Sequence, residues 1–489
     1  MKKLSLFKHQ KEGLERALSR PSFALFMEQG TGKSAIAIRL SEHRYRKKQI
    51  QRVIIFAPNS ILYNWELEIQ KFMTLRPSQY EVHRLRGKTK KDREIELHRA
   101  FRTNNKLNIL LLNYEKALAH TKELVDFKAE QLIFDESHKL KSPGRKTKIT
   151  NTIFKIAQKA ATPFRLLMTG TPICNGYEDL FMQYKIMDPS IFGQTYGDFK
   201  AQYLVMGGYM GYEIKGYRNV EDIKKVLDET SFRVLLTDCI ELPDINFKYY
   251  TCELNRTAQK HYNEMDGDMQ TSLQNSKDYS RKEIKSLLKS KGVIYKPKEK
   301  YKSLLTKALF FLDLASCDLL ITKIMRLQQI TGGFLTTDNN EVINISKDKL
   351  KVLDEILSVE KKTLVFCRYV AEIEMIENHL KGKFRVRSYR DPKTRDKYYK
   401  EFKEGKVDVL ILQLSSGSVG LNLQEASRVV FYSWSYKADE YVQAISRMKR
   451  SGQKQTMEVS HILAEDTIDA DILSVIGKKV KLAKKLFRK

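Results

Sequence analysis

The amino-acid sequence predicts an α/β protein built of two tandem lobes, each a parallel sheet flanked by helices. Short apolar runs recur through the first half of the chain and are separated by amphipathic stretches. The same pattern returns in the second half, whereas strand signals fade between the halves. Apolar runs of this length, bounded by turn residues, are typical of parallel strands buried on both faces.

Nine apolar runs predict the strands in chain order. The first lobe is predicted to hold FALFM (23–27), VIIFAP (53–58), NILLLNY (108–114), QLIFDE (131–136) and RLLMTG (165–170). The second is predicted to hold KTLVFCRY (362–369), VDVLILQ (407–413), RVVFYSW (428–434) and MEVSHIL (457–463). We therefore expect a first lobe over 1–245, a helical and basic region over 246–340, a second lobe over 341–475 and a basic tail over 476–489.

Two insertions interrupt this pattern. Residues 201–240 contain a Gly- and Tyr-rich piece, MGGYMGYEIKGY, which predicts a small hairpin within the first lobe. The stretch 281–307 holds ten Lys or Arg and two Glu, and the last twelve residues hold seven basic side chains and no acid. Both basic stretches are candidates for contact with a polyanion, although a basic tail is as easily just solvated.

Composition excludes several classes of protein. The chain has 489 residues, 42% of them hydrophobic, and a net charge of +29, which suits nucleic acid or an anionic membrane face as partner. It has no run of 18 apolar residues, so no membrane span is expected, and its N-terminus turns polar too early for a signal peptide. Five scattered cysteines without a CxxC pair argue against a disulfide scaffold or a zinc site and fit a reducing cytosol.

A glycine-rich turn follows the first predicted strand. Residues 27–34 read MEQGTGKS and precede the helical stretch AIAIRLSEH. Such a turn points several backbone N–H groups to one side, where the helix dipole adds positive potential. Gly30 and Gly32 let the backbone approach a phosphate. Lys33 can reach the β and γ phosphates, and the Ser34 hydroxyl can ligate Mg²⁺. The motif matches the short form GxGK[ST], for which a chance glycine turn is the alternative.

Two adjacent carboxylates follow a later strand in the sequence LIFDESH (132–138). The carboxyl end of a parallel strand is where α/β sheets bind ligands. Asp135 can hold the shell of a Mg²⁺ ion through water, and Glu136 can orient and deprotonate an attacking water. An acidic helix N-cap is the alternative for the pair alone, but a phosphate loop about 100 residues upstream favours phosphoryl transfer.

The order of the motifs resembles the superfamily-two helicases, and within them the Swi/Snf-like branch of ATP-dependent DNA translocases. The resemblance is carried by GTGKS, DESH, MTGTP (168–172), LSSGSVGLNL (414–423) and QAISRMKRSGQ (443–453). It is supported by LFKHQKEGL (6–14), APNSILYNWELEIQKF (57–72) and MRLQQITGGF (325–334). The family fold implies two RecA-like lobes with ATP in the cleft between them and helical protrusions on each lobe.

The resemblance also implies roles for individual residues. The groups implied to bind ATP and Mg²⁺ are Gln10, Gly30, Thr31, Gly32, Lys33, Ser34, Asp135 and Gln443. Arg447 and Arg450 resemble the arginines of the second lobe that reach the γ phosphate, where a planar, permanently charged guanidinium stabilises transition-state charge. Thr169 and Thr171 fall in the motif that links hydrolysis to lobe motion, and Gly420 and Asn422 in the motif that couples nucleic acid to the cleft.

The sequence therefore predicts a DNA-dependent ATPase that moves along duplex DNA, because a track of phosphate contacts explains a charge of +29 without base reading. One alternative is a helicase that separates strands at forks, with Tyr209, Tyr212 and Tyr217 of the hairpin as a pin. Another is a non-catalytic scaffold with a vestigial site, against which the intact Lys33, Glu136 and Arg450 argue. RNA is disfavoured only by the family branch.

Trp65, Trp434 and His138 are interpreted as packing or linking residues. The compact motor suggests a bacterial or phage protein, cytoplasmic in its cell or host.

Overall fold

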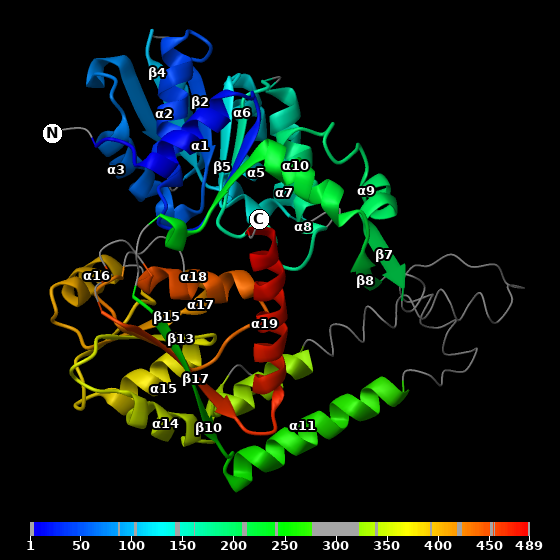
Figure 1. Ribbon diagram of the computed structural model, residues 1–489. Helices are drawn as coiled ribbons and strands as arrows, with labels where there is room; N and C mark the ends of the chain where they lie inside the picture. The colour runs from blue at the N-terminus through cyan, green and yellow to red at the C-terminus, as the bar shows by residue number, and fades with distance from the viewer. Residues whose placement is uncertain are drawn as a thin grey trace, which may run out of the picture.

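The fold consists of two lobes that lie one above the other (Figure 1). It is given by a computed structural model that describes residues 4–86, 89–101, 105–141, 147–160, 162–207, 213–239, 243–275, 322–337, 341–391, 394–417, 423–449, 453 and 455–487. Each lobe is built around its own parallel sheet. The prediction of a two-lobed α/β protein is confirmed.

The first lobe contains a seven-stranded sheet in which every neighbouring pair is parallel. In spatial order its strands are β3 (Tyr80–Arg84), β4 (Leu107–Leu112), β2 (Arg52–Phe56), β5 (Gln131–Asp135), β6 (Arg165–Met168), β1 (Phe23–Met27) and β9 (Ser231–Val234). Five of these strands were predicted. The edge strands β3 and β9 were not, because polar residues interrupt their apolar runs.

Both faces of this sheet are buried, which explains why its central strands are continuously apolar. On β1, Ala24 and Phe26 belong to one core, whereas Leu25 and Met27 belong to the core on the other face. The first core is covered mainly by α5 (Tyr114–Ala119), α7 (Lys148–Lys159), α8 (Asp179–Met187), α9 (Tyr196–Tyr203) and α10 (Val220–Thr230). The second is covered by α1 (Lys8–Leu18), α2 (Lys33–Arg46) and α3 (Leu62–Phe72).

The strand order places three loops side by side at one edge of the first sheet. Strand β6 lies between β1 and β5, and Met168 at its end pairs in register with both Leu25 and Asp135. Because all three strands run parallel, the segments that follow them leave the sheet at the same edge. The glycine-rich turn, the two carboxylates and the MTGTP segment therefore meet there, facing the second lobe (Figure 1).

The second lobe contains a six-stranded sheet, again parallel throughout. Its spatial order is β10 (Ile245–Cys252), β17 (Met457–Ala464), β16 (Arg428–Phe431), β13 (Thr363–Cys367), β15 (Val409–Gln413) and β14 (Val386–Ser388). Helices α18 (Ala438–Met448) and α19 (Ile468–Phe487) pack on one face, and α14 (Asp348–Ile356) and α15 (Val370–Leu380) on the other.

The segment from residue 246 onward differs from the helical region that we expected. It begins with β10, an edge strand that pairs with β17 over eight residues, and only then continues as α11 (Arg256–Asn275). The strand escaped prediction because INFKYYTC is half exposed and mixed in polarity. The basic stretch 281–307 lies outside the described residues.

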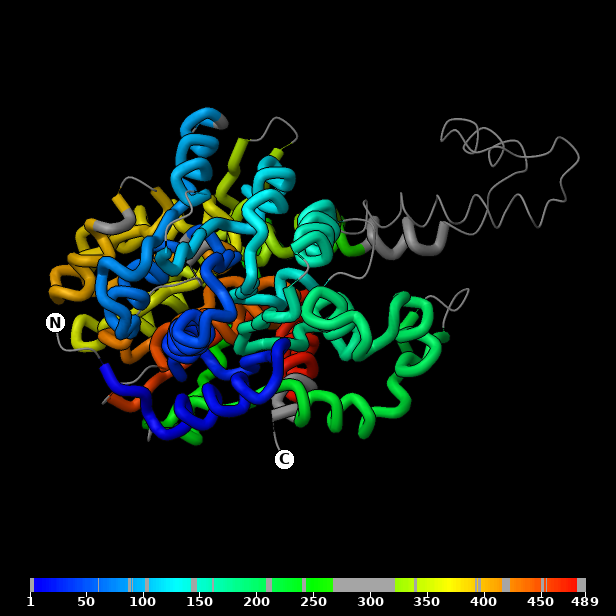
Figure 2. The backbone as a smooth tube through the Cα atoms, turned by 90° about the horizontal axis from the view of Figure 1, so that it is seen from above, coloured from blue at the N-terminus to red at the C-terminus, as the bar shows by residue number. Residues whose placement is uncertain are grey.

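The small insertion in the first lobe is a hairpin, as predicted. Its strands β7 (Leu204–Gly207) and β8 (Glu213–Tyr217) pair antiparallel. A separate antiparallel pair, β11 (Phe334–Thr336) and β12 (Val342–Asn344), precedes α14 of the second lobe. Seen from above, the green part of the first lobe that holds α9 and α10 projects sideways from the stacked lobes (Figure 2).

The C-terminal helix α19 connects the two lobes. It runs up along the second lobe and ends beside the first (Figure 1). Lys479 Nζ donates to Asn175 Oδ1 of the first lobe and to the carbonyl of Tyr436 in the second, both at 3.1 Å. This part of the basic tail is therefore structural. None of the helices in the described ranges is long and apolar enough for a membrane span.

Candidate nucleotide-binding cleft

The glycine-rich turn after β1 has the backbone shape of a phosphate-binding loop. Gly30 and Gly32 have φ angles of +87° and +85°, a region that residues with a Cβ rarely occupy, and α2 begins directly after them. Lys33 Nζ donates to the carbonyl of Met27 at 2.8 Å and to that of Glu28 at 3.3 Å. The lysine side chain thus folds back across the loop, where it lines a cavity.

Gln10 of α1 lies directly on this loop. Its amide Nε2 donates to the carbonyl of Thr31 at 3.1 Å, and its Oε1 accepts from the backbone N–H of Phe7 at 3.0 Å. His9 Nε2 lies 2.8 Å from the same Thr31 carbonyl. A Cβ on Gly32 would displace the amide of Gln10 from this position, and the φ angle of Gly32 is itself one that L side chains rarely adopt.

Asp135 is the last residue of β5, Glu136 follows it, and both are buried. Glu136 has φ +53° and ψ +50°, a left-handed conformation that is strained for a residue with a Cβ. Its backbone N–H donates to Asp135 Oδ1 at 3.0 Å, and the indole Nε1 of Trp65 donates to Asp135 Oδ2 at 2.9 Å. The turn directs the two carboxylates in different directions, each with its own partners.

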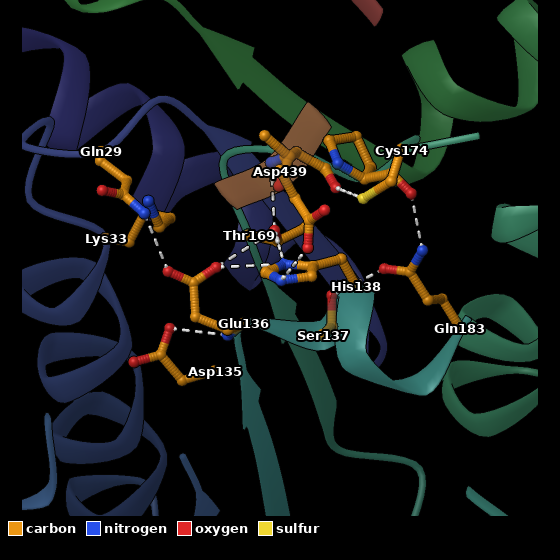
Figure 3. Close-up of polar contacts among 12 residues, drawn as sticks. Gln29, Lys33, Asp135, Glu136, Ser137, His138, Thr169, Cys174, Gln183 and Asp439 are labelled. Atoms are coloured by element: carbon orange, nitrogen blue, oxygen red, sulfur yellow. Dashed lines mark hydrogen bonds and ion pairs between the residues drawn. The ribbon is translucent and has the colours of Figure 1, made fainter. Parts of the chain in front are cut away.

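The Glu136 carboxylate is held by groups from three segments (Figure 3). Gln29 Nε2 donates to Oε1 at 3.2 Å, and the Thr169 hydroxyl donates to Oε2 at 3.4 Å. His138 Nδ1 lies 3.3 Å from the same Oε2 and 2.9 Å from Thr169 Oγ1. Thr169 follows β6, so the strand order described above brings these groups together.

The environment drives the pKa values of the two carboxyls apart. Burial and the neighbouring charge of Glu136 raise the pKa of Asp135 to about 6, although Lys33 opposes the shift. Burial also disfavours the charge of Glu136, but the hydrogen bond from His138 and the charges of Lys33 and Arg447 outweigh it and lower the pKa to about 2. Glu136 is therefore ionised at neutral pH. Asp135, beside it, has too little positive charge nearby to offset its burial and the charge of Glu136.

The second lobe completes the cleft through α18. Arg447 is buried and lines the same cavity of about 240 Å³ as the loop and the two carboxylates. Ser446 Oγ donates to Gln29 Oε1 at 2.5 Å, and Lys449 Nζ donates to Glu28 Oε1 at 3.0 Å. The cavity is lined by Gln29, Gly30, Gly32, Lys33, Ser34, Ile61, Asn64, Trp65, Glu68, Asp135, Glu136 and Arg447.

Some residues singled out by the sequence lie elsewhere. Gln443 is buried on α18, one turn before Arg447, and does not line the cavity. Thr171 follows Thr169 and donates its backbone N–H to the Thr169 hydroxyl at 3.1 Å. Arg450, Gly420 and Asn422 lie outside the described residues.

One of the three hairpin tyrosines lies in the described part of the chain and contacts the first lobe. The hydroxyl of Tyr217 donates to Glu178 Oε2 at 3.1 Å, and its ring packs edge-on against Tyr177 at 4.8 Å. Tyr217 is therefore engaged within the first lobe, which argues against its interpretation as part of a strand-separating pin. Tyr209 and Tyr212 lie outside the described residues.

Three residues at the cleft have contacts that the sequence did not indicate. Trp65 packs in the core of the first lobe, as predicted, and its indole also donates to a site carboxylate. His138 was interpreted as a linker, yet it contacts Glu136 and Thr169. Gln29 stood within the loop motif without a role, and nothing in the sequence spacing indicates that it bridges Glu136 to the second lobe.

Comparisons with known proteins define the class of this cleft. The SNF2-related domain family matches residues 9–303, and the helicase conserved C-terminal domain family matches residues 348–452. The first match alone covers more than half of the chain. The chain belongs to the family of the SNF2-related domain, and its two lobes are RecA-like.

Individual relatives are distant and longer. The chain is 25% identical over 98% of its length to an uncharacterized ATP-dependent helicase, MG018, of Mycoplasma genitalium, and spans 42% of that protein. It is 26% identical over 98% of its length to the SWI/SNF chromatin-remodeling complex subunit snf22 of Schizosaccharomyces pombe, and spans 28% of it. A structure of the Sulfolobus solfataricus SWI2/SNF2 ATPase core in complex with dsDNA aligns over 99% of this chain and 93% of that one, at 20% identity and a TM-score of 0.42.

Proposed function

We propose that this protein is a DNA-dependent ATPase that couples ATP hydrolysis to translocation along duplex DNA. The observation that carries the proposal is one cavity lined by a phosphate-type loop, two carboxylates and an arginine from the opposite lobe. Motors of this kind bind ATP between two lobes, so that ATP binding and hydrolysis of the γ phosphate change the relative orientation of the lobes. The relatives named above support the ATP-dependent part of the proposal.

The donor set suits a nucleoside triphosphate with Mg²⁺. The loop N–H groups and Lys33 would neutralise the phosphates, and Gln10 and Thr31 would border the base. Ser34 and Asp135 would hold Mg²⁺, for which a hydroxyl and a carboxylate are favoured donors. The raised pKa of Asp135 marks a place where positive charge is missing, as expected of a cation site. When bound, the ion would neutralise charge that develops on the phosphate oxygens.

Glu136 and Arg447 supply the remaining chemistry in this proposal. Glu136 is ionised and is held by Gln29, Thr169 and His138, so it can orient the attacking water and accept its proton. Arg447 would stabilise the charge on the γ phosphate from the second lobe, and Arg450 would assist it. Gln443 would report the γ phosphate through α18 rather than by lining the cavity.

Duplex DNA is the polymer that we propose for the track. A net charge of +29 favours a polyanion, and contacts to backbone phosphates require no base recognition. The strand-separating helicase has less support, because the Tyr217 ring is engaged with Tyr177 and Glu178. A non-catalytic scaffold is disfavoured, because Lys33, Glu136 and Arg447 meet at one cavity.

ATPase rates with duplex DNA, single-stranded DNA, RNA and no nucleic acid test the proposal. We expect the largest stimulation by duplex DNA, displacement of a triplex-forming strand and little unwinding of a forked duplex. Lys33→Ala should abolish turnover, whereas Glu136→Gln should bind ATP and hydrolyse it far more slowly, because an amide cannot accept the water proton. Turnover at the wild-type rate in either variant would contradict the site, and efficient fork unwinding would favour the helicase.

A further inference from the structure

A carboxylate of the second lobe reaches the group that holds Glu136. Asp439 lies in the first turn of α18, and its Oδ2 is 3.8 Å from His138 Nε2 across the cleft (Figure 3). Both side chains are largely buried, with 16% of Asp439 and 4% of His138 exposed. The contact therefore forms in a space from which most water is excluded, where a charge acts more strongly on its neighbours.

The two nitrogens of His138 face opposite lobes. Nε2 faces Asp439, whereas Nδ1 faces Glu136 Oε2 at 3.3 Å and Thr169 Oγ1 at 2.9 Å. A carboxylate beside one imidazole nitrogen restrains the plane of the ring and favours the tautomer that carries its proton on that side. The orientation that His138 presents to Glu136 thus depends on a residue that belongs to the other lobe.

Other charged groups face Asp439 from the first lobe. Burial alone would lower the pKa of Lys141, but the proximity of Cys174, Asp439 and Asp179 outweighs it and raises that pKa. Asp439 is therefore close enough to Lys141 to act on its charge, in addition to its contact with His138. Both of these side chains belong to the first lobe and are basic.

The adjacent acid on the same helix provides a comparison. An acid in the first turn commonly just stabilises the helix dipole, and Glu440 occupies the same turn. Glu440 accepts from Ser435 Oγ at 2.7 Å and from Lys437 Nζ at 3.0 Å, both within its own lobe. The contact of Asp439 instead crosses the cleft to the catalytic carboxylate's partner.

We propose that Asp439 is a positioning residue for ATP hydrolysis, which holds His138 in the orientation that serves Glu136 when the lobes are closed. This inference rests on the proposed ATPase function and deepens it. It means that the surroundings of the water-activating carboxylate are complete only when the second lobe is in place. Hydrolysis then depends on closure of the two lobes through two residues of the second lobe, Arg447 and Asp439.

The kinetic test uses the full chain with duplex DNA and saturating ATP. We expect Asp439→Asn to lower kcat about tenfold, the size expected for coupled neighbours, with the KM for ATP little changed. Glu440→Gln, the matched control, should keep the kcat of the wild type. In a His138→Ala background, Asp439→Asn should cause no further loss, because the residue acts through His138.

Three kinetic outcomes would overturn the inference: an unchanged kcat in Asp439→Asn, an equal loss in Glu440→Gln, or losses from Asp439 and His138 that multiply. A second measurement does not depend on activity. Side-chain ¹⁵N shifts of labelled histidine, with the His138 signals assigned through His138→Ala, should change in Asp439→Asn and not in Glu440→Gln. Unchanged His138 shifts would refute the contact even if the chain hydrolysed no ATP, whereas absent wild-type hydrolysis would refute only the proposed function.

Discussion

Replacing Asp135 by Asn should stabilise the nucleotide-free protein while it destroys the site. Burial and the charge of Glu136 raise the pKa of Asp135 from its ordinary value of 3.8 to about 6. A carboxyl with a raised pKa binds its proton more tightly in the folded state, so folding stability falls as the pH rises from about 4 to about 6 and stays reduced above. At about 1.4 kcal/mol per pKa unit, ionising Asp135 costs the folded state about 3 kcal/mol at pH 8.

The neutral amide of Asn removes this cost, and its single acceptor oxygen keeps one of the two hydrogen bonds that Asp135 accepts, from the Trp65 indole or from the Glu136 N–H. We therefore expect the free energy of unfolding to rise by about 3 kcal/mol at pH 8, by about half of that at pH 5, and little at pH 4. The measurement is urea unfolding without Mg²⁺ or nucleotide, followed by tryptophan fluorescence. The chain has two tryptophans, so a Trp434→Phe background leaves Trp65, in the first lobe, as the reporter.

The pH dependence distinguishes this explanation from improved packing. A gain of equal size at pH 4 and pH 8 would show that the charge of Asp135 is not its source. A loss of stability at pH 8 would refute the reasoning, because the carboxylate would then be better stabilised in the folded protein than in water. Glu68→Gln, a change at another carboxylate that lines the cavity, is the control for a general effect of removing negative charge.

Three further predictions concern the motor. Trp65→Phe should lower kcat about tenfold or more, because Asp135 loses a hydrogen bond worth about 1.5–3 kcal/mol, and unchanged turnover would assign Trp65 to packing alone. Arg447→Ala should lower kcat by about 10³-fold with a smaller effect on ATP affinity, and a variant with normal kcat would mean that ATP is not held between the lobes. DNA affinity should fall by about 0.9 log units per log unit of salt for each phosphate contacted, and removing residues 482–489, which spares Lys479, should reduce this slope without changing basal ATPase; a flat salt dependence would refute the phosphate track.

Strand identity and the site motifs were accessible from the sequence because each depends on local pattern. A strand buried on both faces must be apolar throughout, so FALFM and QLIFD could be predicted without knowing their neighbours. The loop of Gly30 and Gly32 was readable for the same reason, since its φ angles require glycine. Strand β10 was not, because an edge strand has one half-exposed face and mixed polarity.

Contacts that cross between strands or lobes were decided by the tertiary structure alone. The sequence placed Lys33 and Asp135 about 100 residues apart, and only the order of β1, β6 and β5 brings them to one edge of the sheet. Gln29, Trp65 and Asp439 carry no local signal, because a single polar or aromatic side chain acquires its role from a partner that is distant in the chain, 70 residues away for Trp65 and 417 for Gln29. Sequence determines which segments fold as strands, loops and helices, whereas the packing of two lobes determines which of their side chains share a cleft.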